Sequence, residues 1–509
     1  MLLALVAAGC ASLPPLDDRP VSTALPATSD SRIARAVQAA AAANPGKTGI
    51  HVLSQPKDSF AARALLARAA DLSLDVQYYI WHGDTTGYLL MEELWNAAER
   101  GIRVRLLLDD NGTSGLDDAI AALDSHPAIE VRLFNPFVNR SFRALGYLTD
   151  FSRLNRRMHN KSFTADSQAT IVGGRNIGDE YFGAGDGMLF ADLDVVAVGA
   201  VVGDVSRSFD QYWASASAYP AEAIVGQADD DAVPALLEKF REVRTSPTAL
   251  EYISAVGNSG LVQQLLDRNL PLEWAPAQLV VDEPAKTLGK VEASELMLTR
   301  LGQAIGEVGR ELDIVSPYFV PGKEGTKQLS AYPERGVALR ILTNSLAATD
   351  VGAVHAGYAK RRKDLLRAGT RLYELKPDTG EAGEGKPAAT KSEVFKGSSA
   401  ASLHAKSMAA DRQRLFVGSF NLDLRSVSLN TEMGLVIESP GLASALSDWL
   451  DDSMPLAAYE VRLAADGQSL EWVERTPQGE VIHTSEPETG FFKQLGIGFL
   501  ALLPIDWML

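Results

Sequence analysis

The sequence predicts an α/β protein that consists of two similar halves. Its main indication is a pair of motifs, each a histidine, any residue, a lysine and then an aspartate five positions after the lysine. The two histidines lie 245 positions apart, about half of the 509-residue chain. The segments ahead of each motif also match, at offsets of 238 and 235 positions. A period of this length is far above that of solenoid repeats and therefore indicates a duplicated domain.

In the first half, apolar positions at helical spacing predict a helix over residues 59–70, and residues 74–80 (LDVQYYI) predict a strand. A second helix carries Leu90, Leu94 and Ala97 on one face and is expected to end at Gly101, because glycine suits the left-handed backbone at a helix C-terminus. Residues 102–108 predict a buried strand, residues 109–112 (DDNG) a turn, and residues 130–134 another strand.

The second half repeats this order. Residues 312–315 match the first strand, and residues 334–342 (ERGVALRIL) match residues 99–107 (ERGIRVRLL). One helix with Val354, Tyr358, Arg361 and Leu365 on one face is expected to end at Gly369, before a strand over residues 370–374. Strands that alternate with helices predict, in each half, a mainly parallel sheet flanked by helices on both faces.

Apolar positions at helical spacing continue between the halves and indicate a helical connector. We therefore expect five segments: a signal and tether over 1–30, a first α/β domain over 31–220, the connector over 221–278, a second α/β domain over 279–485, and an apolar C-terminal segment over 486–509. The last nineteen residues are too short and interrupted for a membrane-spanning helix. A segment lying in the lipid interface and a terminal helix packed on the core both remain open.

Cys10 is the single cysteine, so an internal disulfide is excluded. An apolar run precedes it and Ala11 and Ser12 follow, which resembles the lipobox of bacterial lipoproteins, in which this cysteine is lipidated. That resemblance implies a bacterial envelope protein anchored to a membrane through Cys10. The alternative is a short apolar start with a chance cysteine, because no positively charged region precedes the run.

The net charge of −17 argues against nucleic acid as a partner, since phosphate neutralisation requires a basic surface. Five of the seven histidines have no motif around them and are assigned no role: His51, His82, His126, His355 and His483. His159 and His404 each carry a lysine two residues on, Lys161 and Lys406. Residues two apart in a strand point to one face, so the duplication would bring two imidazoles and two ammonium groups to one space between the halves.

That set of groups suits a phosphodiester. One neutral histidine can attack phosphorus and form a phosphohistidine, while the other, protonated, gives its proton to the leaving alcohol. The phosphoryl oxygens would be held by Lys161, Lys406, Asn176 and Asn421. No metal is required, the sequence has no cluster with metal-ligand spacing, and no cofactor is expected.

Further residues would support the two histidines. The turns that follow the motifs, residues 173–176 (GGRN) and 418–421 (GSFN), contain Gly174 and Ser419 beside the asparagines. An acidic partner would orient each imidazole: Asp192 or Asp194 for one half and Glu432 for the other. We expect the motif aspartates, Asp166 and Asp411, to hold their loops rather than to carry protons.

The two motifs with their GGRN and GSFN turns resemble the phospholipase D superfamily, over most of residues 50–440. Residues 174–182 (GRNIGDEYF) and 502–507 (LLPIDW) look most like bacterial cardiolipin synthases, particularly the C type. The resemblance implies two phospholipase D-like α/β domains with the active site at their interface. The catalytic residues that it implies are His159, Lys161, Asp166, His404, Lys406 and Asp411.

The resemblance further implies a phosphatidyltransferase that makes cardiolipin through a phosphohistidine. Phosphatidylethanolamine or phosphatidylglycerol would be the donor and phosphatidylglycerol the acceptor, with His159 as nucleophile and His404 as acid and base. A hydrolytic phospholipase D that releases phosphatidic acid is the alternative. A nuclease and an inactive lipid-binding protein are two further alternative functions. The expected partners are phospholipids and a membrane surface. Head groups, leaflet and oligomeric state are left open by the sequence.

Overall fold

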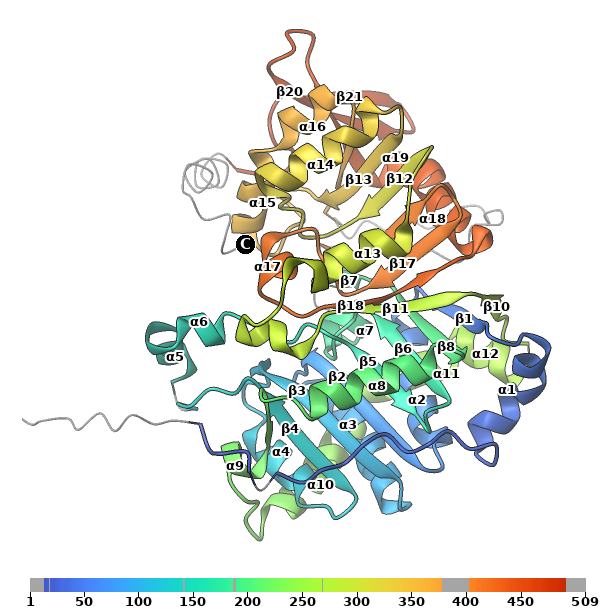
Figure 1. Cartoon of the computed structure of the whole chain (residues 1–509), viewed down its shortest axis with the longest axis vertical. Coiled ribbons are helices and arrows are strands. Elements are labelled where there is room, and N and C mark those ends of the chain that lie inside the picture. Colours follow the sequence, from blue (N-terminus) through green and yellow to red (C-terminus); the bar gives the residue numbers. More distant parts are fainter. Residues whose placement is uncertain are drawn as a thin grey trace, which may run out of the picture.

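The computed structural model describes residues 13–17, 19–140, 142–185, 189–267, 269–377 and 402–490. Within these ranges the chain forms two halves, each with a large sheet flanked by helices (Figure 1). Cys10 and residues 491–509, on which the two membrane-anchoring predictions rest, lie outside the described residues. None of the helices in the described ranges has the length and apolar character needed to cross a bilayer.

The first half begins with a helix and then alternates strands with helices. Its elements are α1 (Arg32–Ala43), β1 (Thr48–Leu53), α2 (Pro56–Ala69), β2 (Ser73–Ile80), α3 (Thr85–Glu99), β3 (Arg103–Gly112), α4 (Asp117–Asp124), β4 (Ile129–Phe134), α5 (Arg143–Thr149), α6 (Phe151–Leu154), β5 (Ser162–Ala165), β6 (Ala169–Gly173), α7 (Asp179–Phe182), β7 (Phe190–Ala191), β8 (Asp194–Gly199), α8 (Val202–Trp213) and β9 (Ala218–Pro220). Four helices and a strand follow: α9 (Glu222–Val225), α10 (Ala232–Arg244), α11 (Pro247–Gly257), α12 (Gly260–Leu266) and β10 (Glu273–Ala275).

The second half repeats the plan with some additions. Its elements are β11 (Ala277–Val281), η1 (Pro284–Leu288), η2 (Ala293–Glu295), α13 (Met297–Ile305), β12 (Glu311–Val315), α14 (Gly322–Glu334), β13 (Ala338–Asn344), α15 (Gly352–Ala359), α16 (Arg362–Ala368), β14 (Arg371–Leu375), β15 (Ser402–Leu403), β16 (Lys406–Ala410), β17 (Arg414–Gly418), α17 (Leu424–Ser428), β18 (Met433–Ile437), α18 (Pro440–Asp452), α19 (Met454–Ala457), β19 (Ala458–Leu463), β20 (Leu470–Thr476) and β21 (Gly479–His483).

The predicted α/β class and the duplication are confirmed, but the sheets are not mainly parallel. The first sheet has the order β10-β1-β8-β6-β5-β2-β3-β4-β9 and the second β11-β18-β17-β16-β12-β13-β14-β19-β20-β21. Only β2, β3 and β4 run parallel in the first, and only β12, β13 and β14 in the second. The strands of each motif are joined to the next by the short turns 166–168 and 411–413, which allow only an antiparallel hairpin.

Two local predictions are also corrected. Strand β3 continues through Gly112, so the turn expected at residues 109–112 comes later. Gly112 pairs with Ile80 across a bulge, and a side chain there would come within 2.0 Å of the Tyr79 carbonyl oxygen. The single helix expected before Gly369 is two helices, α15 and α16. Gly101 and Gly369 have φ of +83° and +99°, as their predicted place at a helix end requires.

The duplication extends to a buried ion pair in each half. Arg105 on β3 binds Asp75 on β2 through two contacts of 2.7 and 2.9 Å, and Arg340 on β13 binds Asp313 on β12 at 2.6 and 2.8 Å. Each half has its own apolar core, and a third apolar cluster joins residues from both, such as Val172 and Leu435. Because this cluster is buried, it fixes the position of one motif relative to the other.

Residues 221–278 contain helices, as the apolar spacing of this segment predicts, and these helices pack on the first half. Helix α10 contacts α3 and α4, while α11 and α12 contact α2. The chain then passes from the first sheet to the second through a single residue. Strand β10 pairs with β1 in the first sheet, and β11, which follows Pro276, pairs with β18 in the second.

Candidate functional site

The two histidine motifs meet at the contact between the halves, where backbone pairing repeats with the duplication. His159 donates its backbone N–H to the Thr431 oxygen at 2.9 Å, and His404 donates to the Ala191 oxygen at 2.8 Å. The short strands β15 and β7 run parallel beside the second of these contacts. Each segment that leads into a histidine therefore pairs with the segment of the other half that leads into an acid.

Each imidazole receives a carboxylate from the other half. His159 Nδ1 lies 2.8 Å from Glu432 Oε2, and His404 Nδ1 lies 2.5 Å from Asp192 Oδ2. With Nδ1 occupied, Nε2 of each ring is the nitrogen left for chemistry. Of the two candidates for the second acid, the structure therefore brings Asp192 to a histidine. Asp194 begins β8 after a break in the strand and binds Arg63 at 2.9 Å instead.

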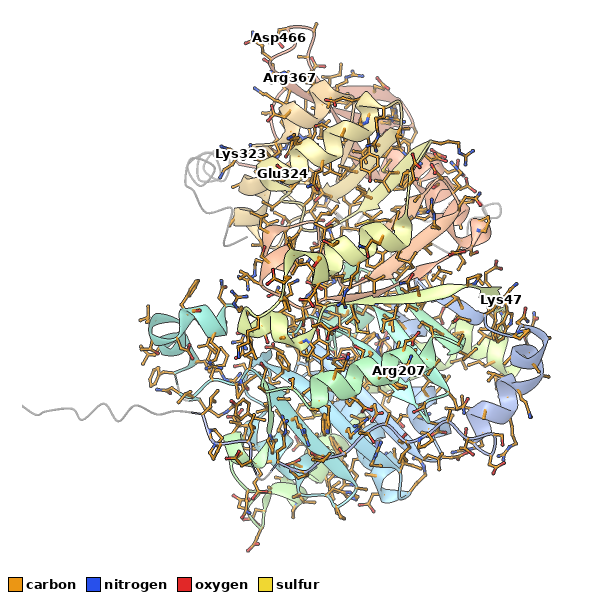
Figure 2. The ribbon with its side chains drawn as sticks, viewed as in Figure 1. Lys47, Arg207, Lys323, Glu324, Arg367 and Asp466 are labelled. Atoms are coloured by element: carbon orange, nitrogen blue, oxygen red, sulfur yellow. The ribbon has the colours of Figure 1, made fainter. Side chains whose placement is uncertain are left out.

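The two motif lysines are buried beside their histidines. Lys161 Nζ donates to the His159 carbonyl oxygen at 2.6 Å, and Lys406 Nζ donates to that of His404. Both lysines are 1% exposed, whereas charged residues such as Lys323 lie at the surface (Figure 2). Burial lowers the pKa of Lys161 to about 7 and that of Lys406 to about 8. A bound phosphate anion would stabilise both ammonium groups.

The two histidine–acid pairs differ in charge. Burial raises the pKa of Glu432 to about 7. Burial acts the same way on Asp192, but His404, Lys406 and Arg175 together outweigh it and hold the Asp192 pKa well below its ordinary value. The pKa of His159 is lowered far more than that of His404, in both cases by burial and by the nearby lysines. The arrangement therefore favours a neutral imidazole at His159 more strongly than at His404, where the charge of Asp192 partly offsets the effect of burial.

The segments that follow the motifs also give the two carboxylates different hydrogen-bond partners. Glu432 accepts hydrogen bonds from Ser419 Oγ at 2.5 Å and Ser426 Oγ at 2.7 Å. In the first half Gly174 takes the place of Ser419, and a Cβ there would lie 2.2 Å from Asp192 Oδ1. Glycine at this position thus lets the shorter carboxylate approach the backbone.

The two asparagines of the turns have different surroundings. Asn176 is held within the protein, since its Oδ1 accepts from the Ile80 N–H at 3.2 Å and its Nδ2 donates to Tyr181 Oη at 3.0 Å. Asn421 has a buried Oδ1 for which no hydrogen-bond partner is present among the described residues. Their predicted contact with phosphoryl oxygens stays a prediction.

The motif aspartates lie at the far ends of their strands, away from the imidazoles. Asp166 accepts from the backbone N–H groups of residues 71, 72 and 73 at 2.8–3.1 Å. Asp411 does the same for residues 309, 310 and 311 at 2.7–3.0 Å. Both have φ of +54°, in the turn of their hairpin. These contacts support a role in holding the loops.

We expect Asp166→Ala to lower the free energy of unfolding by about 2–4 kcal/mol, because three backbone N–H groups, one buried and two half-buried, lose a carboxylate acceptor. Urea unfolding measures this loss, and Asp166→Asn, which keeps one acceptor oxygen, should lose less. The folded fraction of either variant should keep its catalytic rate. A rate loss of about 100-fold in fully folded Asp166→Asn protein would instead make Asp166 part of the chemistry.

Several residues near the site have no motif and were missed by sequence reasoning. Asp109 accepts from the Met158 N–H at 2.8 Å, and Asn344 exchanges two hydrogen bonds with the backbone of Leu403. Each thus positions the residue before a catalytic candidate. The two lie 235 positions apart, Asp109 within β3 and Asn344 at the end of β13, so aligning the two halves of the sequence could have found them.

Aromatic rings cover both imidazoles. The Tyr79 ring centroid lies 5.0 Å from that of His159, and those of Tyr181 and Phe190 lie 5.3 and 5.1 Å from that of His404. His159 is 8% exposed and His404 6%. These rings limit access of water to the histidines.

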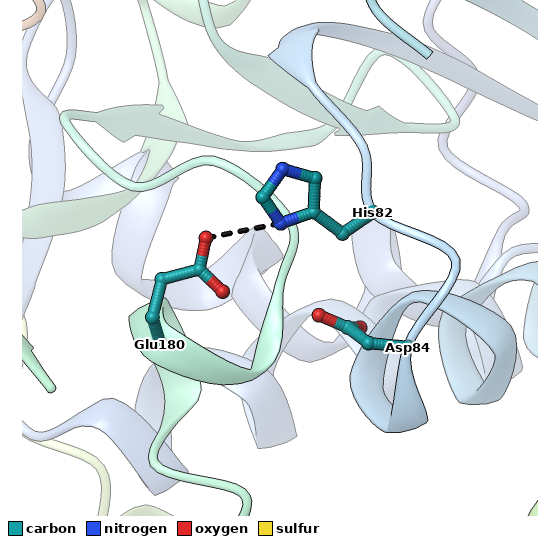
Figure 3. Close-up of side chains that lie close together, drawn as sticks. All are labelled: His82, Asp84 and Glu180. Atoms are coloured by element: carbon teal, nitrogen blue, oxygen red, sulfur yellow. Dashed lines mark ion pairs between the residues drawn. The ribbon is translucent and has the colours of Figure 1, made fainter. Parts of the chain in front are cut away.

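One group of side chains could offer ligands to a metal, and sequence reasoning had assigned its histidine no role. His82, Asp84 and Glu180 bring three ligand atoms within 4.8 Å of one another (Figure 3). His82 Nδ1 lies 3.0 Å from Glu180 Oε1, and this contact raises the pKa of His82. Asp84 already caps α3 at the Gly87 N–H. The contacts fit an ion pair that ties the end of β2 to α7.

The geometry of the site supports transfer of a phosphoryl-type group. It combines two imidazoles whose pKa values are lowered to different extents, two buried ammonium groups and a carboxylate behind each ring. A neutral imidazole suits a nucleophile, a protonated one a general acid, and the ammonium groups an anionic centre between them.

Comparison with known proteins gives consistent matches. A family profile described as "Cardiolipin synthase, PLD-like domain" matches residues 63–213 and 301–454. Cardiolipin synthase C of Escherichia coli (strain K12) is 47% identical over 94% of this chain and 100% of that protein. An uncharacterized protein of Helicobacter pylori (strain J99) is 32% identical over 91% of this chain and 89% of its own length. The crystal structure of phosphatidylserine synthase from Haemophilus influenzae Rd KW20 shares the fold, with a TM-score of 0.57, 12% identity, and coverage of 94% of this chain and 100% of that one.

Proposed function

Because the chain belongs to the family of cardiolipin synthases with phospholipase D-like domains, we propose that it is a phosphatidyltransferase. It moves a phosphatidyl group from a donor phospholipid to the hydroxyl of phosphatidylglycerol and so makes cardiolipin. The donor is phosphatidylethanolamine or a second phosphatidylglycerol. The observation that carries the proposal is the crossed pair of histidine–carboxylate contacts between the halves.

In the first step His159 Nε2 attacks phosphorus. A P–N bond forms, the P–O bond to the donor's head-group alcohol breaks, and His404 gives its proton to the departing oxygen. The lowered pKa of His159 supports its role as the neutral nucleophile, and the charge of Asp192 supports His404 as the acid. Lys161 and Lys406 stabilise the charge on the phosphoryl oxygens.

In the second step the acceptor hydroxyl replaces the departed alcohol. His404 takes its proton, the oxygen attacks phosphorus, and the P–N bond breaks to release His159. Hydrolysis would differ only in that water attacks, so the alternative is a phospholipase D that releases phosphatidic acid. The aromatic cover over both imidazoles favours an alcohol acceptor, because it limits the entry of water.

The protein acts on phospholipids, and we infer that it works at a bacterial membrane surface with no nucleic acid as partner. Lipidation of Cys10 remains part of this proposal, as does the division of the chain at residues 30, 220, 278 and 485. Mass spectrometry of an acyl group on the N-terminal peptide, prepared from bacterial membranes, tests the lipidation directly.

The proposed reaction is tested with purified protein in detergent–lipid micelles. We expect cardiolipin and free ethanolamine when phosphatidylethanolamine and phosphatidylglycerol are supplied together, followed by mass spectrometry. Cardiolipin and glycerol formed from phosphatidylglycerol alone would support a cardiolipin synthase whose donor is phosphatidylglycerol. Phosphatidic acid as the main product in every mixture would show that the protein is a hydrolase and not a transferase. A variant that lacks both His159 and His404 serves as the blank.

A further inference from the structure

Large apolar side chains are exposed together on the segment just ahead of the first motif. Of the sixteen large hydrophobic side chains exposed on the described residues, five fall within residues 138–151: Val138, Phe142, Leu145, Leu148 and Phe151. Leu148 is 82% exposed and Phe142 68%. The segment contains α5 and α6, which stand out at the left edge of the first half in Figure 1. An exposed group of this kind marks a contact surface.

The outward side of this segment is uncharged. Its most exposed described residues are the apolar ones and Asn139, Ala144, Thr149 and Ser152. The arginines turn toward the protein: Arg140 binds Asp117 at 2.6 Å, and Arg143 donates to the Asp110 carbonyl oxygen at 2.7 Å. The one acidic residue, Asp150, is paired with Arg153 at 2.6 Å. Charge inside and apolar groups outside reverse the usual pattern of a helix that faces water.

The segment lies beside the proposed reaction centre. On α5, Tyr147 Oη donates to Asn111 Oδ1 at 2.9 Å, and Asn111 Nδ2 donates to Tyr79 Oη at 3.1 Å. The Tyr79 ring packs on His159. At its other end the segment is held by the second half, where Arg425 donates to Asn155 Oδ1 at 2.6 Å. A phospholipid with its phosphate at His159 would thus have this apolar surface close to its acyl chains.

We propose that residues 138–157 are a membrane-contact element, whose apolar side inserts at the boundary between head groups and acyl chains. This inference rests on the proposed function, which requires phospholipids to reach the site from a bilayer. The five arginines of the segment are all bound to groups of the protein, so the contact with lipid rests on the exposed apolar side chains. The segment differs from the predicted anchors at the two ends of the chain, since it holds the reaction centre itself against the membrane.

A depth measurement tests the contact in the full-length chain with Cys10→Ser. Leu148→Cys, labelled with a bimane fluorophore, should lose most of its fluorescence on phosphatidylethanolamine–phosphatidylglycerol vesicles with brominated acyl chains. The matched control is Leu456→Cys on α19, where leucine is 59% exposed; its label should not be quenched. Equal quenching at both positions, or none at 148 on vesicle-bound protein, overturns the proposal. So does a concentration-dependent shift of the 148 label without vesicles, which would make a second copy the occupant.

An activity comparison separates this inference from the proposed function. Leu145→Gln with Leu148→Gln should lower the transfer rate on vesicles at least about tenfold and leave the rate on monomeric short-chain phospholipids unchanged. Leu456→Gln should change neither rate. An equal loss on both substrates, or no loss on vesicles, counts against the membrane contact alone. Failure of the wild-type protein to transfer from either substrate counts against the proposed function instead.

Discussion

Replacing His159 by alanine is expected to lower the transfer rate by a factor of about 10⁴ or more, and replacing His404 should cost a similar amount. In the proposed mechanism each ring has a different task in one reaction, so neither half of the molecule is expected to work alone. Both rings are buried with their Nδ1 on a carboxylate of the other half, which is why no other side chain can take over. The measurement is the rate of cardiolipin formation in micelles, with circular dichroism as a control for folding.

A donor with a good leaving group assigns the two roles. With a phosphatidyl ester of p-nitrophenol the departing oxygen needs no proton, so His404→Ala should still release one equivalent of nitrophenolate. Mass spectrometry should then find the phosphatidyl group on His159. His159→Ala should give neither the burst nor the adduct. The opposite pattern would make His404 the nucleophile, and wild-type turnover in either variant would end the two-histidine mechanism.

Asp192→Asn is expected to lower kcat about 10²- to 10⁴-fold near pH 7, much more than Glu432→Gln. The charge of Asp192 stabilises the proton on His404, so the amide lowers the pKa of His404 further and leaves less of the acid at neutral pH. Glu432, with a pKa of about 7, already holds a proton in part of the molecules, and its loss of charge should cost only about tenfold. Both substitutions keep the size of the side chain.

The pH dependence of kcat distinguishes this effect from a loss of packing. For the wild-type protein, kcat should fall as the pH rises through the pKa of His404, because the proton donor is lost. In Asp192→Asn this fall should begin at lower pH, so the variant recovers toward the wild-type rate as the pH is lowered. Glu432→Gln should leave this limb in place. A uniform loss at every pH in Asp192→Asn would contradict a role in proton transfer.

The sequence by itself determined the repeated motif, the α/β class and the order of most elements. Local patterns suffice for these, since helical spacing, β-branched runs and glycines such as Gly101 act within a few residues. The proximity of His159 and His404 could also be predicted, because the two copies of a duplicated motif can face each other at the interface between the halves. The direction of most strands could not be predicted from the sequence. It depends on whether each connection is a hairpin or a crossover, and therefore on how the chain returns over the sheet.

Only the tertiary structure decided which acid serves which histidine. Asp192 and Asp194 are equal candidates in the sequence, and the break between β7 and β8 turns one to His404 and the other to Arg63. The sequence also does not predict that each carboxylate contacts the histidine of the opposite half, as Glu432 contacts His159 across 273 residues. The outward apolar side of α5 and α6 likewise appears only when the arginines of the segment find their partners on the protein body. Such pairings follow from long-range packing, which no local pattern of residues records.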